Sequence, residues 1–156
     1  MPSILLSVNQ NRIAINRASI RRSAKKILSA LECTESELSI TLVDDDEMAR
    51  LNTEYRGVEE TTDVLSFPMH EGEFGDVAPE MLGDIVISAP TAQEMARRHG
   101  CSMDTILDLL LVHGTLHLLD LDHEQGPDAA RFMHEKSLEI LRMLGHTDKD
   151  FEWYRS

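Results

Sequence analysis

The segment HGTLHLLDLDH, residues 113–123, places three histidines at relative positions 0, 4 and 10. Residues four apart lie on the same face of a helix, so His113 and His117 can present their imidazole rings to one metal ion. Ten residues of unbroken helix rise about 15 Å, so His123 can join them only if the helix ends and the chain turns back. The spacing therefore predicts a helix that stops soon after His117.

The residues that precede the histidines predict where this helix lies. Residues 106–112 form an apolar run with one acidic interruption, which is too short to cross a membrane and favours a buried helix. We expect this helix to span Met103 to Leu119. A turn at Asp120 is compatible with that end, because aspartate is one of the few residues besides glycine that adopts the left-handed conformation.

The chemistry of the three side chains favours a particular kind of metal. Neutral imidazoles without thiolates suit zinc or another late first-row divalent ion, and three protein ligands leave a fourth position for water, as in catalytic zinc sites. In the alternative, each ring is satisfied by ordinary hydrogen bonds, and several polar rings are then buried with no evident purpose. We expect one Zn²⁺ bound by His113, His117 and His123.

Hydrophobic periodicity along the rest of the chain indicates strands interleaved with helices, followed by helices alone. We expect strands at 3–8, 38–43, 63–67 and 84–88, and helices at 18–31, from Asp44 or Asp45 to Tyr55, and at 91–99, 103–119 and 128–144. This order predicts an α+β fold: a small mixed four-stranded sheet covered by helices, with the metal-binding histidine helix in the core. Without repeats or a long linker, residues 1–156 are expected to form a single domain.

Cysteine content bears on the compartment. The 156 residues include only Cys33 and Cys101, and neither belongs to a CxxC pair. A chain of this length folds without disulfides, and no apolar leader precedes the first strand. We therefore expect a reduced, cytoplasmic protein with no membrane segment.

The charge is unevenly distributed. A net charge of −13 by itself argues against nucleic acid as a partner. Residues 1–31, however, contain no acidic residue and six basic ones, namely Arg12, Arg17, Arg21, Arg22, Lys25 and Lys26. This basic amino-terminal segment is compatible either with a solvated helix face or with a contact to a polyanion.

The same histidine spacing occurs in the metzincin proteases, whose motif is HExxHxxGxxH. In that motif the first histidine is followed by a glutamate that acts as the general base, and here that position is Gly114. The pattern thus predicts the same arrangement of metal-binding histidines as in these proteases, but without the glutamate that serves as their general base. Because a glycine inside a helix costs about 1 kcal/mol relative to alanine, Gly114 indicates that a substrate or a neighbouring strand closely approaches the helix.

Four segments resemble a known family. HGTLHLLDLDH resembles the HGxLHLxGYDH signature of the YbeY family, bacterial metal-dependent endoribonucleases that act in maturation of small-subunit ribosomal RNA. LNTEYRG at 51–57, TDVLSFP at 62–68 and LGDIVIS at 82–88 resemble further blocks of that family in the same order, so the resemblance covers most of residues 40–145. Asp120 and Leu121 stand where the family has glycine and tyrosine, and neither is a ligand position.

The resemblance implies a function and a set of site residues. The chain is expected to hydrolyse single-stranded RNA endonucleolytically with zinc, acting on a ribosomal RNA precursor in 16S rRNA maturation and ribosome biogenesis, with the small ribosomal subunit as partner. By the same resemblance, the metal ligands are His113, His117 and His123, and Arg56 faces the substrate phosphate. A metal and a guanidinium can together stabilise the negative charge that develops on phosphate oxygens during cleavage.

Three residues of the matching segments have no assigned role. Asp63, Ser66 and Asp84 can belong to the site or can support strands and loops. Two other functions also stay open: a metallopeptidase whose base comes from elsewhere in the chain, against which Gly114 counts, and a ribosome-associated RNA-binding factor with a structural metal. The oligomeric state is not determined by these patterns.

Overall fold

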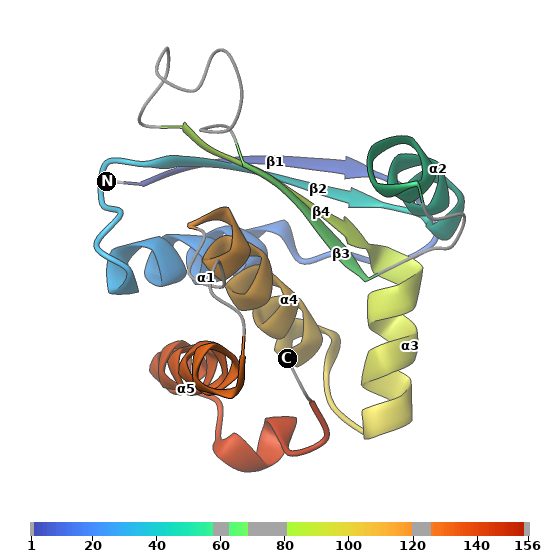
Figure 1. Cartoon of the computed structure of the whole chain (residues 1–156). Helices are drawn as coiled ribbons and strands as arrows, with labels where there is room; N and C mark the ends of the chain where they lie inside the picture. Colours follow the sequence, from blue (N-terminus) through green and yellow to red (C-terminus); the bar gives the residue numbers. More distant parts are fainter. Residues whose placement is uncertain (1, 58–62, 69–80, 120–125, 155–156) are drawn as a thin grey trace.

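The computed structural model describes residues 2–57, 63–68, 81–119 and 126–154. Strands are interleaved with helices as far as α3, with β3 and β4 consecutive, and only helices follow (Figure 1). In chain order the elements are β1 (Ser3–Asn9), α1 (Arg17–Ala30), β2 (Glu37–Val43), α2 (Asp45–Arg56), β3 (Val64–Pro68), β4 (Met81–Ser88), α3 (Ala89–His99), α4 (Met103–Leu118), α5 (Pro127–Met143) and the 3₁₀ helix η1 (Asp148–Phe151). The α+β fold is confirmed.

The four strands form one mixed sheet in the order β1-β2-β4-β3. β1, β2 and β4 run parallel, and β3 pairs antiparallel with β4, which makes β3 an edge strand. Paired residues of adjacent strands point to the same face, so the register defines two faces. One row across the sheet is Leu6, Ile40, Ile85 and Ser66, and the row on the opposite face is Leu5, Ser39, Asp84 and Phe67.

The face that carries Ile40 and Ile85, here called the inner face, holds the main core. α1 and α4 pack beneath it and α5 lies farther below, so the helices form two further layers (Figure 1). α4 is buried along most of its length, with Ile106, Leu110 and Leu116 fully enclosed. The predicted position of the histidine helix in the core is confirmed.

The opposite face, here called the outer face, is covered more sparsely. α2 packs at one end of it, where Val43, Met48, Leu65 and Val86 form a small buried cluster. Leu5 of β1 is 52% exposed on the same face. Among the described residues, therefore, α2 shields only part of the outer face.

Local capping explains where the helices begin. Asp44, rather than Asp45, caps α2: its carboxylate accepts a hydrogen bond from the Glu47 amide at 2.8 Å. Asp45 instead accepts hydrogen bonds from the hydroxyls of Ser88 at 2.5 Å and Thr91 at 2.7 Å. Ser88 caps α3 and a proline occupies its first turn, so α3 begins two residues before the predicted start at 91.

One strand boundary differs from the prediction by three residues. β4 begins at Met81 rather than Asp84, because residues 81–83 continue the pairing with β2 and β3. A glycine at position 83 tolerates its φ of 144° there. Neither Cys33 nor Cys101 forms a disulfide, and none of the described helices is both long and apolar enough to cross a membrane.

Candidate metal centre

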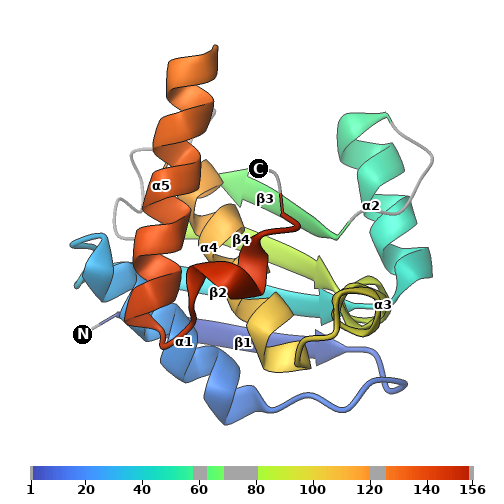
Figure 2. The same ribbon diagram turned by 90° about the horizontal axis from the view of Figure 1, so that it is seen from below.

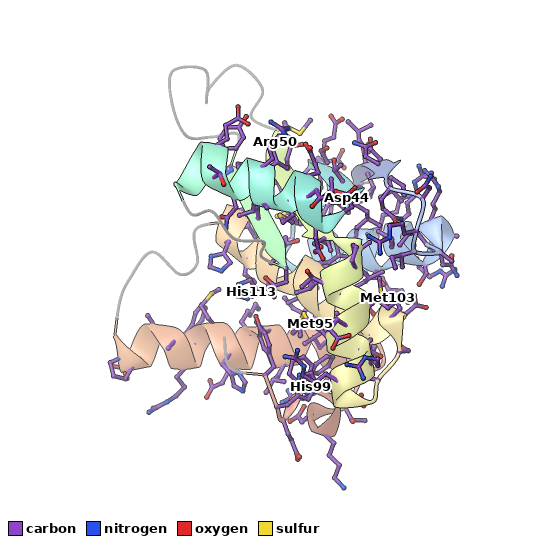
Figure 3. The ribbon with its side chains drawn as sticks, turned by 90° about the vertical axis from the view of Figure 1, so that its right-hand side faces the viewer. Asp44, Arg50, Met95, His99, Met103 and His113 are labelled. Carbon is purple, nitrogen blue, oxygen red and sulfur yellow. The ribbon has the colours of Figure 1, made fainter. Side chains whose placement is uncertain are left out.

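The histidine pair lies near the carboxyl end of α4. The helix begins after Ser102, whose hydroxyl accepts a hydrogen bond from the Thr105 amide, and ends at Leu118, with Leu119 as its carboxyl-terminal cap. The prediction that this helix stops near Leu119 is confirmed. Figure 3 shows His113 projecting from α4 between α2 above and α5 below.

The rings of His113 and His117 converge as the spacing predicts. Their Nε2 atoms are 2.7 Å apart, and the ring centroids are separated by 4.3 Å with the planes inclined at 62°. Both side chains are partly buried. Two nitrogens that point at one another in this way can bind the same ion or share a proton.

Tyr154 contacts the other nitrogen of His113. Its hydroxyl lies 2.9 Å from Nδ1, with the two rings nearly perpendicular at 89°. Burial, and to a smaller extent the charge of Asp63, raises the pKa of Tyr154 to about 12, so the phenol stays protonated at neutral pH. When this oxygen accepts from Nδ1–H, the Nε2 lone pair of His113 points toward His117.

The carboxyl-terminal segment holds Tyr154 in this position. After α5 and η1 the chain turns back across α4 (Figure 2). Phe151 is buried in the core, and the Trp153 ring stacks on His99 at 3.7 Å with the planes 7° apart. In the same carboxyl-terminal segment, His146 Nε2 lies 2.7 Å from the Asp108 carboxylate of α4. The sequence patterns gave no role to Tyr154, because 41 residues separate it from His113 and no spacing rule connects them.

Gly114 allows two strands to approach α4 closely. A Cβ atom at this position would meet the Ile85 side chain at 3.1 Å and Ser66 Oγ at 3.2 Å. The Ser66 hydroxyl also donates a hydrogen bond to the Gly114 carbonyl at 3.1 Å. Of the two explanations for this glycine, the structure supports the neighbouring strand, and it gives Ser66 the role of joining β3 to α4.

Replacing Gly114 with valine is therefore expected to destabilise the fold. Three additional carbons against the fully buried Ile85 overpack the junction of α4 with β3 and β4, which lowers the free energy of unfolding by about 2–3 kcal/mol. Urea unfolding followed by circular dichroism measures this, with Gly114→Ala as the smaller step. An unchanged midpoint for the valine variant would contradict the tight packing inferred for this junction.

Several predicted site residues have no described side chain. His123, the expected third ligand, lies outside the described residues, and so do Asp120, the expected turn residue, and Leu121. Arg56 is the last residue of α2, before Gly57 with its φ of 70°, but its side chain is not described. Within residues 2–57, 63–68, 81–119 and 126–154, no third histidine, cysteine or carboxylate joins the pair as a ligand group.

The remaining candidate residues have distinct places. Asp63 precedes β3, and its carboxylate accepts a hydrogen bond from the Val64 amide at 2.8 Å, in keeping with a strand-capping role. Asp84 points to the outer face. The basic residues of α1 are all exposed, and α1 packs on β1, at the sheet edge opposite β3. The basic segment and the histidine pair thus lie toward opposite edges of the sheet.

Known proteins match this chain over most of its length. Residues 5–145 match the family model described as Endoribonuclease YbeY. The chain is 38% identical to the endoribonuclease YbeY of Syntrophus aciditrophicus over 150 residues, which cover 96% of this chain and 94% of that protein. It is 41% identical to that of Geobacter sulfurreducens over 142 residues, covering 90% and 95%, and 42% identical to that of Aquifex aeolicus over 130 residues, covering 83% and 85%.

The fold also matches a solved structure. The solution structure of TM1509 from Thermotoga maritima superposes with a TM-score of 0.63 at 25% sequence identity. The match covers 91% of this chain and 87% of the Thermotoga protein. The arrangement of helices on a small mixed sheet is therefore shared with that structure.

Proposed function

The chain belongs to the Endoribonuclease YbeY family, and from this premise we infer that it is an endoribonuclease, a hydrolase that cuts RNA at internal phosphodiester bonds. We further propose that cleavage depends on one zinc ion bound by His113, His117 and His123. The observation that carries this proposal is the convergence of the His113 and His117 Nε2 atoms at 2.7 Å on a buried helix.

The histidine pair fits a zinc ion. Two nitrogens that each lie 2.0–2.1 Å from a tetrahedral zinc are about 3.3 Å apart. Small rotations of the two side chains that widen the Nε2–Nε2 distance from 2.7 Å by several tenths of an ångström would therefore admit the ion. Nitrogen ligands without thiolates suit zinc or a similar late first-row ion. His123 is the proposed third ligand, since it stands ten residues after His113 and completes the 0, 4, 10 histidine pattern.

The chain's own residues have separable roles in the proposed reaction. A divalent ion bound here would polarise a phosphate oxygen and activate water. His113 and His117 hold that ion, and Tyr154 orients the His113 ring through Nδ1. Arg56 is proposed to place its guanidinium against the substrate phosphate, where it stabilises developing negative charge. Gly114 contributes no carboxylate base, which separates this site from the metzincin arrangement.

The substrate and setting are proposed from family membership. We propose a single-stranded ribosomal RNA precursor as the substrate, with a role in 16S rRNA maturation, the small ribosomal subunit as partner and the cytoplasm as location. The test is to incubate zinc-loaded protein with single-stranded RNA and with an unstructured peptide, each with and without a chelator. Cleavage of RNA alone, abolished by the chelator and restored by zinc, is the expected result; RNA binding without cleavage would favour the binding factor.

RNA affinity is expected to fall steeply with salt despite the net charge of −13. If Arg21 and Arg22 contact phosphates, the double alanine variant should reduce the slope of log affinity against log salt by about 1.4, since each contact with a single strand contributes about 0.7. Arg97→Ala/Arg98→Ala is the matched control, because this exposed pair lies on α3 beside Glu94. Equal slopes for both variants would leave the basic segment as a solvated helix face.

A further inference from the structure

A hollow of about 310 Å³ lies on the outer face of the sheet, beside α2. Four elements contribute to its lining: Thr41 from β2, Leu51 and Tyr55 from α2, Phe67 from β3, and Asp84 and Val86 from β4. This volume is at the lower end of the range for small-molecule sites. The hollow is thus sized for one flat ring system rather than for a long segment of polymer.

Two aromatic side chains form one wall of the hollow. The ring centroids of Tyr55 and Phe67 are 5.0 Å apart, with the planes inclined at 65°. Tyr55 is 62% exposed, although burying its ring would be favourable. Exposed aromatic side chains beside a sheet face are a general means of stacking unpaired RNA bases, because every base has a π face.

Asp84 gives the same hollow a hydrogen-bonding preference. It pairs with Phe67 across β3 and β4, so its carboxylate lies beside the aromatic wall. An ionised carboxylate only accepts hydrogen bonds, and its charge repels phosphate, so it suits a base edge rather than the RNA backbone. The Watson–Crick edge of guanine offers two adjacent N–H donors, which can form the strong paired contact with one carboxylate. Uracil offers one such donor.

The edge strand β3 separates this hollow from the histidine pair. Successive residues of a strand point to opposite faces, and here Ser66 contacts Gly114 of α4 while Phe67 lines the hollow. Figure 3 shows the corresponding arrangement, with α2 above and His113 below. An RNA strand that passes over this edge can therefore place a base in the hollow and its neighbouring backbone beside the histidines.

We propose that the hollow binds a single guanine base of the RNA substrate, stacked on Tyr55 and recognised by Asp84, and thereby selects the bond that is cut. This inference rests on the proposed endoribonuclease function and extends it to base selection. It makes Tyr55 a substrate-binding residue and Asp84 the residue that determines specificity.

Binding is measured first, without catalysis. Fluorescent oligouridine strands with or without one central guanine are titrated against the full chain in excess chelator. The guanine strand is expected to bind more tightly to the wild type, and Tyr55→Ala to weaken it by about 5- to 140-fold, whereas Tyr55→Phe retains the ring and most of the affinity. Asp84→Asn should bring the two strands to similar affinities. Leu5→Ala is the matched control, since it removes a comparably exposed apolar side chain from the same face.

Mapping the cuts made by the zinc-loaded enzyme in an RNA of mixed sequence is the second measurement. Cuts are expected at a fixed offset from guanines in the wild type and Leu5→Ala, and the preference should be lost in Asp84→Asn. If folded Tyr55→Ala binds guanine strands like the wild type and cuts the same bonds, the hollow is not a base site, while the endoribonuclease function stands. If Tyr55→Ala loses guanine binding but the wild-type protein itself cuts no RNA, the result would support the hollow as a base site and overturn the endoribonuclease function.

Discussion

Replacing His117 with alanine is expected to lower the rate of RNA cleavage by on the order of 10³-fold. The variant lacks one of the proposed zinc ligands, and without the ion the negative charge that develops on the phosphate loses its electrostatic stabilisation. The fold should persist, since alanine is the best helix former and His117 is only partly buried near the end of α4. Initial rates on labelled single-stranded RNA, with zinc content measured on the same samples, test this expectation.

The matched control for His117→Ala is His134→Ala. His134 lies on α5 and has no ligand spacing with the pair. The His134→Ala variant should cleave RNA and bind zinc as the wild type does. A His117→Ala variant that loses zinc but still cuts RNA would show that the metal is structural, and one that retains stoichiometric zinc would remove His117 from the ligand set.

Replacing Tyr154 with phenylalanine is expected to weaken zinc binding by about 10- to 100-fold, the usual effect of losing a group that orients a ligating histidine. The variant keeps the aromatic ring, which packs edge-on to Trp153 at 5.7 Å, and removes only the hydroxyl that contacts His113 Nδ1. Competition between the metal-free protein and a chromogenic chelator gives the affinity. Tyr154 is in this view a positioning residue, because it acts through His113.

A second variant separates the hydroxyl from the packing of the carboxyl-terminal segment. Trp153→Phe weakens the stack on His99 and removes the hydrogen bond from Nε1 to the Asp150 carbonyl, yet it leaves the Tyr154 hydroxyl in place. Trp153→Phe should lower the midpoint of urea unfolding while its zinc affinity falls less than that of Tyr154→Phe. Equal losses of zinc affinity in both variants would mean that the segment's packing, and not the phenol, supports the metal site.

Much of the fold was predictable because burial on one or two faces imposes regular periods on the sequence. The histidine helix shows this best: its apolar residues and the end near Leu119 match α4, which spans Met103–Leu118. The strand order was not predictable, because nothing local places β4 between β2 and β3. That order depends on tertiary packing, in which apolar side chains of the strands join those of α1 and α4 in one core on the inner face.

The candidate site divides in a similar way. The four-residue spacing predicted that His113 and His117 share a helix face, and the structure brings their Nε2 atoms together. The places of His123 and of the Arg56 side chain stay predictions, since they lie outside what the structure describes. Tyr154 was missed, because a contact between two distant segments leaves no periodic signal.

By itself, the sequence determined the features that depend on local spacing: the helices and strands, the paired histidines, and the family segments between residues 51 and 123. Only the tertiary structure decided what fills the space around them. It showed that Gly114 makes room for β3 and β4, that Tyr154 reaches His113, and that Tyr55, Phe67 and Asp84 line one hollow. The reason is physical: spacing fixes which side chains share a face, whereas packing of whole elements fixes which faces meet.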